Sequence, residues 1–257
     1  MLSVPPFGTD KMKRIALDIT DSTNRYAKAL PSNESKELTL VTAEFQEAGR
    51  GAGTNKWESE QGKNLLFSLI AYPQRLQANQ MFALSEVTAL AIRDALSSYT
   101  PGFQIKWPND IYYNDKKISG MLIENDLRGK WVHRSIIGVG VDINQTSFLS
   151  VAPNPVSLAQ ILGKAVERNQ VLNSILLQFN HYYGMMEREQ FSELHKRYMQ
   201  HLYRRNALHP YTDATGTFQA RIIDVELRSP CAGMSERRTK AIRFQGSKFF
   251  NSKLINS

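Results

Sequence analysis

The stretch KWPNDIYYNDKKISGMLIEN, Lys106–Asn125, places an ammonium, an aromatic ring, a proline, an amide and a carboxylate within its first five residues. The pair Asn114–Asp115 is typical of a two-residue hairpin turn, so the second half is predicted to be a return strand. This hairpin could bring Lys117 on the return strand and Asp110 on the outgoing strand to one end. Either residue alone is more often a solvated hairpin charge. Only their combination with other motifs makes the hairpin a candidate site.

Outward from this hairpin, the chain alternates short apolar runs with amphipathic segments. Helices are expected at 21–30, with Asp21 or Ser22 at the capping position, at 79–99, and from 169 to about 202, where two helices meet near Gly184. A smaller β-unit is expected to start at 216–226. Strands are expected at 14–19, 37–45, 64–72, 103–107, 111–114, 118–125 and 131–144. The pattern indicates an α/β protein.

A glycine loop, QEAGRGAGTNKW over 46–57, precedes the apolar strand at 64–72. It fits neither a Walker A loop nor a dinucleotide fingerprint, because the required lysine-serine pair, the sixth-position glycine and the following helix are missing. Arg50 between two glycines offers a planar donor fork for phosphate or carboxylate. Trp57 offers a flat face for a planar ligand. On its own, the loop is equally consistent with an ordinary glycine-rich hairpin.

Composition narrows the class of protein. The 257 residues carry a net charge of +8, but residues 1–185 hold 19 Lys+Arg against 17 Asp+Glu, and residues 186–257 hold 13 against 7. The basic excess therefore belongs to the C-terminal segment, which favours a solvated appendage over a nucleic-acid surface. No signal-peptide or membrane-helix pattern is present, and a single cysteine, Cys231, leaves no internal disulfide. We expect a cytoplasmic protein.

Five motifs together resemble the biotin protein ligases: DSTN at 21–24, QEAGRG at 46–51, KWPND at 106–110, KKISGMLIE at 116–124 and GVGVDIN at 138–144. They occur in that family's order, and the resemblance covers about residues 14–200. It implies an α/β fold of the α+β type, a class II synthetase-like mixed β-sheet with helices on one side, as a catalytic domain over residues 1–205. A small SH3-like β-barrel, diverged or incomplete, would follow over residues 206–257.

The resemblance also implies an activity and its partners. Members of the family join biotin to ATP as biotinyl-5′-adenylate and pass biotin to one lysine of a biotin carboxyl carrier protein or domain. Biotin and ATP would be substrates, and Mg²⁺ would arrive on the ATP phosphates. The sequence identifies no protein ligand for this ion. The family further suggests a homodimer, with 131–144 as a candidate edge strand. We expect no DNA and no membrane partner.

Residue by residue, the resemblance assigns a biotin pocket and an activating group. Ser22 and Thr23 would bond the ureido ring, although plain helix capping would also explain them. Gln46 would bond polar edges of the ligand, although a satisfied strand-end amide is the alternative. Gly120 would let the backbone approach biotin closely. The full biotin set is Ser22, Thr23, Asn24, Gln46, Gly49, Arg50, Gly51, Ala52, Lys117 and Gly120.

The catalytic assignments carried over are Lys117, Arg50 and Asp110. Lys117 would contact the biotin carboxyl and the α-phosphate, and Arg50 would hold the phosphate under the closing loop. Asp110 would orient or deprotonate the acceptor lysine, whose amine is mostly protonated at neutral pH. The adenylate set is Arg50, Trp57, Asn109, Lys117 and Asn144, with Trp57 and Asn144 assigned to adenine.

The sequence also departs from the family pattern. Ala52 stands where many relatives carry a second basic residue, so the loop would grip the adenylate more through its backbone. The DSTN motif starts at residue 21, which predicts a stand-alone ligase without an N-terminal winged-helix repressor domain. The segment at 227–257 lacks clean strand alternation. It is either a strongly diverged barrel or a segment that is disordered or altered relative to relatives.

Three other functions stay open at this stage. A lipoate ligase or octanoyl transferase of the same superfamily would need a different acyl pocket. A nucleic-acid-binding regulator would use the basic C-terminal segment. A biotin-binding module without catalysis is disfavoured, because holding biotin alone needs neither Arg50 nor Lys117.

Overall fold

We describe a computed structural model of the chain, which covers residues 12–32, 37–51, 53–149, 154–205, 207–213, 216–226 and 239–245. The strands are β1 (Lys13–Thr20), β2 (Thr39–Gln46), β3 (Leu65–Ala71), β4 (Phe103–Lys106), β5 (Asp110–Tyr113), β6 (Lys116–Arg128), β7 (Trp131–Val141), β8 (His209–Asp213), β9 (Gly216–Glu226) and β10 (Thr239–Gln245). The helices are α1 (Thr23–Ala29), the 3₁₀ turn η2 (Ala78–Gln80), α2 (Phe82–Ser97), α3 (Leu158–Leu162), α4 (Arg168–Glu187) and α5 (Phe191–Gln200).

The first seven strands form one mixed sheet in the order β1-β2-β3-β7-β6-β5-β4, in which only β1 and β2 run parallel. This arrangement confirms the predicted mixed α/β sheet. It corrects one prediction, because β7 lies in the middle of the sheet between β3 and β6 and so cannot offer a free edge for dimer formation. The edges of this sheet are β1 and β4.

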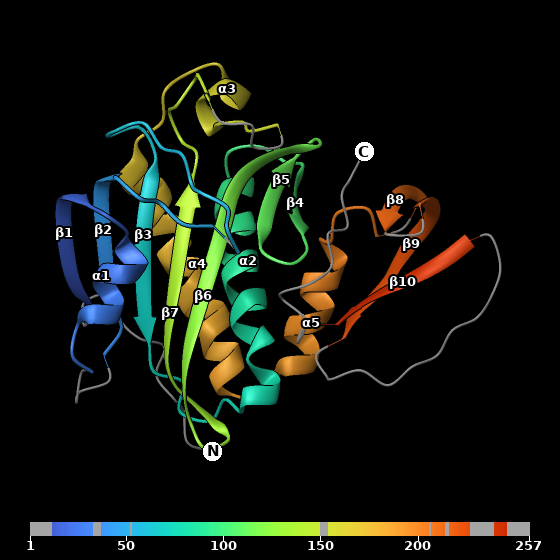
Figure 1. The fold of residues 1–257 in the computed structure, drawn as a ribbon, viewed down its shortest axis with the longest axis horizontal. Helices are drawn as coiled ribbons and strands as arrows, with labels where there is room; N and C mark the ends of the chain where they lie inside the picture. The colour runs from blue at the N-terminus through green and yellow to red at the C-terminus, as the bar shows by residue number, and fades with distance from the viewer. Residues whose placement is uncertain are drawn as a thin grey trace.

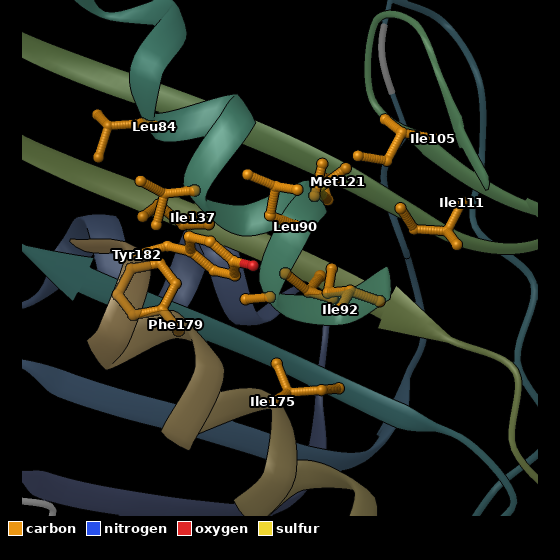
Figure 2. Close-up of a cluster of buried hydrophobic side chains, with 14 of the residues drawn as sticks. Leu84, Leu90, Ile92, Ile105, Ile111, Met121, Ile137, Ile175, Phe179 and Tyr182 are labelled. Atoms are coloured by element: carbon orange, nitrogen blue, oxygen red, sulfur yellow. The ribbon is translucent and has the colours of Figure 1, made fainter. Parts of the chain in front are cut away.

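The sheet separates two apolar clusters of unequal size. The large cluster joins α2, α4 and α5 to one face, and Figure 2 shows its centre, where Leu90 and Ile92 of α2 meet Ile137 of β7 and Phe179 of α4. The small cluster joins Ala27 of α1 to the opposite face. The long helices α2, α4 and α5 therefore lie on one side of the sheet, as expected, and α1 lies on the other side (Figure 1). That lightly covered face carries the candidate site.

The predicted hairpin turn is confirmed. Asn114 and Asp115 both take positive φ, at 45° and 26°, as a tight two-residue hairpin requires. Cross-strand pairing runs from Asp110 opposite Gly120 to Tyr113 opposite Lys116, with one irregularity between Ile111 and Tyr112. This shift of register changes how far Lys117 lies from Asp110 along the hairpin.

The two helices predicted from 169 to about 202 are confirmed as α4 and α5, but they do not meet near Gly184. Gly184 lies inside α4, and the chain leaves the helix only after Glu187, with Glu189 at φ +59°. Glycine costs a helix only about 1 kcal/mol, which the burial of Met185 and Met186 directly after it outweighs. Sequence analysis also missed the short helix α3.

A second sheet of three strands, in the order β10-β9-β8, follows α5 (Figure 1). The strand predicted at 216–226 is confirmed as β9, but it does not begin the unit, because β8 precedes it in the chain and pairs with it antiparallel. Strand β10 also belongs to the predicted barrel, whereas residues 227–238, including Cys231, and 246–257 lie outside the described residues. The division at residue 205 stays a prediction. No helix in the described part of the chain has the length and apolar character needed to cross a membrane.

The junction between the two sheets contains an acid–histidine cluster in which one carboxylate is buried. His195 of α5 has Nδ1 2.6 Å from Glu86 Oε1 and Nε2 3.1 Å from Asp224 Oδ1. Glu86 of α2 is wholly buried and Asp224 lies on β9, so one imidazole joins three elements. The Glu86 hydrogen bond raises the pKa of His195, while burial raises the pKa of Glu86.

Candidate active site

A cavity of about 120 Å³ opens on the face of the sheet that α1 covers. Its walls come from the start of α1, from the glycine loop and from the glycine-rich middle of β6 and β7. The lining residues are Ser22, Thr23, Asn24, Gln46, Arg50, Gly51, Asn55, Lys56, Trp57, Asn109, Asp110, Lys117, Gly120, Met121, Leu122, Gly138, Val139 and Gly140. Eleven of the predicted site residues therefore meet in one place, although they are spread over almost 100 positions of sequence.

Three glycines form the floor of this cavity. Gly120 pairs with Gly140 across β6 and β7, and both lie on the same face as Gly138. A Cβ on Gly138 would lie 2.2 Å from Asn24 Oδ1, and one on Gly140 would lie 2.3 Å from Cε2 of Trp57. Only glycine permits such a close approach, so the alternation GVG in β7 creates the space for the site. Sequence analysis named Gly120 but missed the other two.

The glycine loop folds back on itself as a short antiparallel bridge between Arg50 and Lys56. The Gly51 amide donates to the Asn55 carbonyl at 2.8 Å, and the Trp57 amide donates to the Gly49 carbonyl at 3.0 Å. Gly49 is buried against the loop, where a Cβ would lie 2.5 Å from the Trp57 carbonyl oxygen. Gly49 therefore shapes the loop and does not line the cavity, while Ala52 lies outside the described residues.

The biotin-side residues are held by a network around the start of α1. Gln46 Oε1 accepts from the Thr23 amide at 2.7 Å and from its hydroxyl at 3.0 Å, so this amide oxygen satisfies the first turn of the helix. Ser68 on β3 donates to Asn24 Oδ1 at 2.7 Å and lies 2.8 Å from Thr23 Oγ1. Ser68 is wholly buried and was missed, because a serine within an apolar strand carries no signal in the sequence.

Ser22 occupies the N-cap position of α1, but its side chain makes no capping hydrogen bond. Asp21 does not cap the helix either, because it accepts from the Ser22 amide and pairs with Arg25. The prediction that Asp21 or Ser22 takes the capping position is thus confirmed for Ser22, but the oxygen that satisfies the first turn comes from Gln46. The Ser22 hydroxyl lines the cavity.

The hairpin charges meet as the hairpin geometry predicted. Lys117 Nζ lies 2.6 Å from Asp110 Oδ1 and 5.6 Å from the centre of the Trp57 ring. Lys106, which pairs with Asp110 across β4 and β5, donates to the Tyr112 hydroxyl at 2.9 Å, and burial lowers its pKa. Two lysines thus flank the Asp110 carboxylate at the cavity rim, with the fixed charge of Lys117 turned into the cavity.

Arg50 enters the cavity wall from the glycine loop and pairs with Glu124 of β6. The distance from Arg50 Nη1 to Glu124 Oε2 is 3.8 Å. The same carboxylate accepts from Asn24 Nδ2 at 3.0 Å and lies 3.6 Å from Lys28 Nζ. Sequence analysis did not single out Glu124, although it ends the KKISGMLIE motif.

The two predicted asparagines behave differently. Asn109 lines the cavity, and its amide donates to the Met121 carbonyl at 2.6 Å, which fixes the hairpin to β6. Asn144 does not reach the cavity, because its side chain both donates to and accepts from the Val166 backbone, each at 2.9 Å. Two backbone bonds hold this amide as a structural clamp on the segment before α4. The assignment of Asn144 to adenine has no support in this arrangement.

Asp142 is a second acidic residue that sequence analysis missed. It continues the glycine face of β7, two residues beyond Gly140, and is 4% exposed. Within the described residues its Oδ1 has no hydrogen-bond partner. Burial raises the pKa of Asp142 well above its usual value, and the positive charge of Lys117 opposes this shift. The arrangement favours a neutral carboxyl beside the cavity.

The chain is similar in sequence to known proteins. The model of the Biotin/lipoate A/B protein ligase family matches residues 16–142. The bifunctional ligase/repressor BirA of Bacillus subtilis is 35% identical over 178 residues, which cover 65% of this chain and 52% of that protein. The biotin--[acetyl-CoA-carboxylase] ligase of Paracoccus denitrificans is 32% identical over 185 residues, which cover 68% of this chain and 75% of that protein.

The fold leads to the same group of proteins. The biotin protein ligase of Aquifex aeolicus, solved in complex with biotin and ATP, superposes with a TM-score of 0.69 at 26% identity, over 82% of this chain and 87% of that chain. The chain belongs to the Biotin/lipoate A/B protein ligase family. Within that family, the relatives it matches are the biotin protein ligases. It spans about half the length of the Bacillus relatives.

Proposed function

We propose that the protein activates biotin with ATP to form biotinyl-5′-AMP and then transfers biotin to a lysine of a biotin carboxyl carrier protein. One observation carries this proposal: a single cavity combines neutral hydrogen-bonding groups at the start of α1 with two fixed cations at its other wall. Ser22, Thr23 and Gln46 suit a neutral polar ring, whereas Arg50 and Lys117 suit a carboxylate and a phosphate. Relatives named as biotin ligases support the same reading.

In the first step, a carboxylate oxygen of biotin attacks the α-phosphorus of ATP. A new P–O bond forms, the bond to the leaving pyrophosphate breaks, and the product is a mixed anhydride. Lys117, at the cavity wall, balances negative charge on the carboxylate and the phosphate as they approach. Arg50 holds the phosphate from the loop, and the glycines around it let the loop close and exclude water. Trp57 gives the adenine a flat surface.

In the second step, the amine of the acceptor lysine attacks the activated carbonyl carbon. An amide bond forms, AMP leaves, and the proton lost by the amine must be accepted. Asp110 lies at the cavity wall and is the candidate to orient or deprotonate that amine. Its ion pair with Lys117 at 2.6 Å would have to loosen first, which happens naturally if Lys117 turns to the phosphate.

The proposed reaction also involves Mg²⁺ and a cellular compartment. Among the described residues, no group of three or more His, Cys, Asp or Glu side chains is arranged to hold a metal. Mg²⁺ would arrive bound to the ATP phosphates. Because the reaction consumes ATP, we place it in the cytoplasm.

The experiment is biotin-dependent exchange of labelled pyrophosphate into ATP, with lipoate and octanoate as matched substrates. Exchange reports the first step alone, so it needs no knowledge of the acceptor. We expect exchange with biotin and none with the other two acids. Exchange with lipoate or octanoate instead would assign the chain to the lipoate branch of the family.

A transfer assay with a biotin carboxyl carrier domain then tests the second step. Biotin on the carrier lysine, found by mass spectrometry, is the expected product. Absence of exchange with all three acids, together with salt-sensitive binding to arbitrary DNA, would favour the nucleic-acid alternative.

A further inference from the structure

The Glu124 carboxylate is the meeting point of three positively polarised groups. Asn24 Nδ2 donates to Oε2 at 3.0 Å, Lys28 Nζ lies 3.6 Å from Oε1, and Arg50 Nη1 lies 3.8 Å from Oε2. Asn24 belongs to the α1 end of the cavity and Arg50 to the glycine loop. One carboxylate therefore touches both the part of the cavity assigned to biotin and the part assigned to the phosphate.

The contact between Arg50 and Glu124 is the longest of the three. At 3.8 Å it is an ion pair without a hydrogen bond, and the Arg50 side chain is 43% exposed. Exposed pairs of this kind are worth less than a tenfold change in an equilibrium. A phosphate can accept two parallel hydrogen bonds from a guanidinium, which is a stronger arrangement. Arg50 is thus held near the cavity by a contact that a phosphate can replace.

We propose that Glu124 is a positioning residue that competes with the anionic group of the ligand for Arg50, and so limits how tightly the adenylate is held. This inference rests on the proposed function, because it takes the phosphate as the ligand group that Arg50 meets. Glu124 keeps the guanidinium at the cavity while no anion is present. When a phosphate displaces it, Lys28 remains 3.6 Å away to balance the carboxylate.

The proposal predicts that two substitutions change the affinity for an anionic ligand in opposite directions. Glu124→Gln keeps an acceptor oxygen for Asn24 but removes the charge that competes for Arg50, so an anionic ligand should bind more tightly. Lys28→Gln leaves Glu124 with fewer counter-charges, so its hold on Arg50 grows and an anionic ligand should bind more weakly. A mere loss of structure would weaken binding in both variants.

The probes are a stable phosphodiester analogue of the adenylate, biotinol-5′-AMP, and the neutral biotinamide. By calorimetry we expect Glu124→Gln to bind the phosphodiester about three-fold more tightly and release it more slowly, with Lys28→Gln about two-fold weaker. Affinity for biotinamide should stay unchanged in both variants. Glu167→Gln and Lys164→Gln are the matched controls, because they make the same charge changes at exposed positions outside the glycine loop and the cavity lining.

A double-mutant cycle tests whether the effect passes through Arg50. On an Arg50→Gln background, Glu124→Gln should no longer tighten binding of the phosphodiester. The proposal is overturned if Glu124→Gln weakens the phosphodiester, shifts biotinamide equally, or has the same effect with and without Arg50. If the wild-type chain binds neither probe, the proposed function fails, which is a separate result from normal binding that Glu124→Gln leaves unchanged.

Discussion

Carboxylates meet positive groups in two regions of this molecule, and the partners differ. In the cavity, Asp110 pairs with Lys117, whose side chain is 24% exposed. At the junction of the two sheets, Glu86 and Asp224 share the titratable ring of His195, and Glu86 has no exposed surface. The cavity pairs can exchange one partner for a ligand anion. In the junction cluster His195 is 23% and Asp224 38% exposed, so only the His195–Glu86 pair, with its fully buried carboxylate, lacks this freedom, and the cluster ties stability to pH.

Burial explains the difference in physical terms. Breaking a partly exposed pair costs little because water replaces the lost partner, whereas breaking a buried pair leaves an uncompensated charge. A site that must accept phosphate and release AMP therefore benefits from exposed pairs. A joint between two sheets benefits from a buried one. Four sets of substitutions test this contrast between the cavity and the junction of the two sheets.

Loss of the cavity ammonium should have the largest effect. We expect Lys117→Ala to lower biotin-dependent pyrophosphate exchange by about a hundredfold to a thousandfold, because one preorganised positive charge at the reacting phosphate is worth that much. The neighbouring Lys116 is exposed on the same strand and provides the matched control. Lys116→Ala should change the exchange rate less than about two-fold, within the usual range for surface substitutions. Equal losses in both variants would contradict the assignment.

The acidic partner should separate the two half-reactions. Asp110→Asn is expected to lower transfer to the carrier lysine about a hundredfold, as loss of a general base does, while pyrophosphate exchange falls less than tenfold. Asp18→Asn, at an exposed position of β1, should leave both rates unchanged. An equal fall in both half-reactions would mean that Asp110 acts through its ion pair with Lys117 and not on the acceptor amine.

Much of this site could be predicted from the sequence because its residues lie in short motifs. The hairpin turn at Asn114–Asp115 fixes φ locally, so the approach of Lys117 to Asp110 followed from spacing. Gly138 and Gly140 were missed as floor residues, because their role depends on which side chains cross them from other elements. The partner of Asn144, the backbone of Val166, could not be predicted for the same reason, and its assignment to adenine stays a prediction.

Residues that act through contacts across the fold left no signal in the sequence. Ser68 and Glu124 lie 44 and 100 positions from Asn24, and only the sheet brings them to it. The joint at His195 combines α2, α5 and β9, which no periodicity connects. Local chemistry was therefore predictable, and support from distant strands was not.

The cavity floor should tolerate less change than a helix interior. Gly140→Ala would put a Cβ 2.3 Å from Trp57 Cε2, so the indole must move. We expect a loss of about 1–3 kcal/mol in the free energy of unfolding, and at least tenfold weaker binding of biotinol-5′-AMP with altered tryptophan fluorescence. Gly184→Ala is the matched control, because its Cβ would meet only the flexible end of Arg188 at 3.3 Å. That variant should be neutral or about 0.5–1 kcal/mol more stable.

The junction should show the smallest effect, visible as a pH dependence. The pKa of His195 is raised, chiefly by its hydrogen bond to Glu86 and despite burial, with Asp224 acting in the same direction. Its ion pairs therefore contribute fully below the unfolded value of about 6.5, and this stability is lost as the pH rises through the raised folded value. Glu86, whose pKa burial raises, also costs stability as the pH rises, but from a lower starting value. Tyr198, the third group beside this cluster, has its pKa raised well above 10 by burial and stays neutral in this range.

Melting temperatures from about pH 6 to about pH 9 measure this contribution. Wild type should lose more stability across that range than His195→Gln, which keeps a polar side chain but cannot gain a proton. His181→Gln, at an exposed position of α4, should keep the wild-type profile. If the melting temperature of His195→Gln falls with pH as steeply as that of wild type, His195 does not contribute to the pH dependence. The junction and the cavity would then differ only in burial.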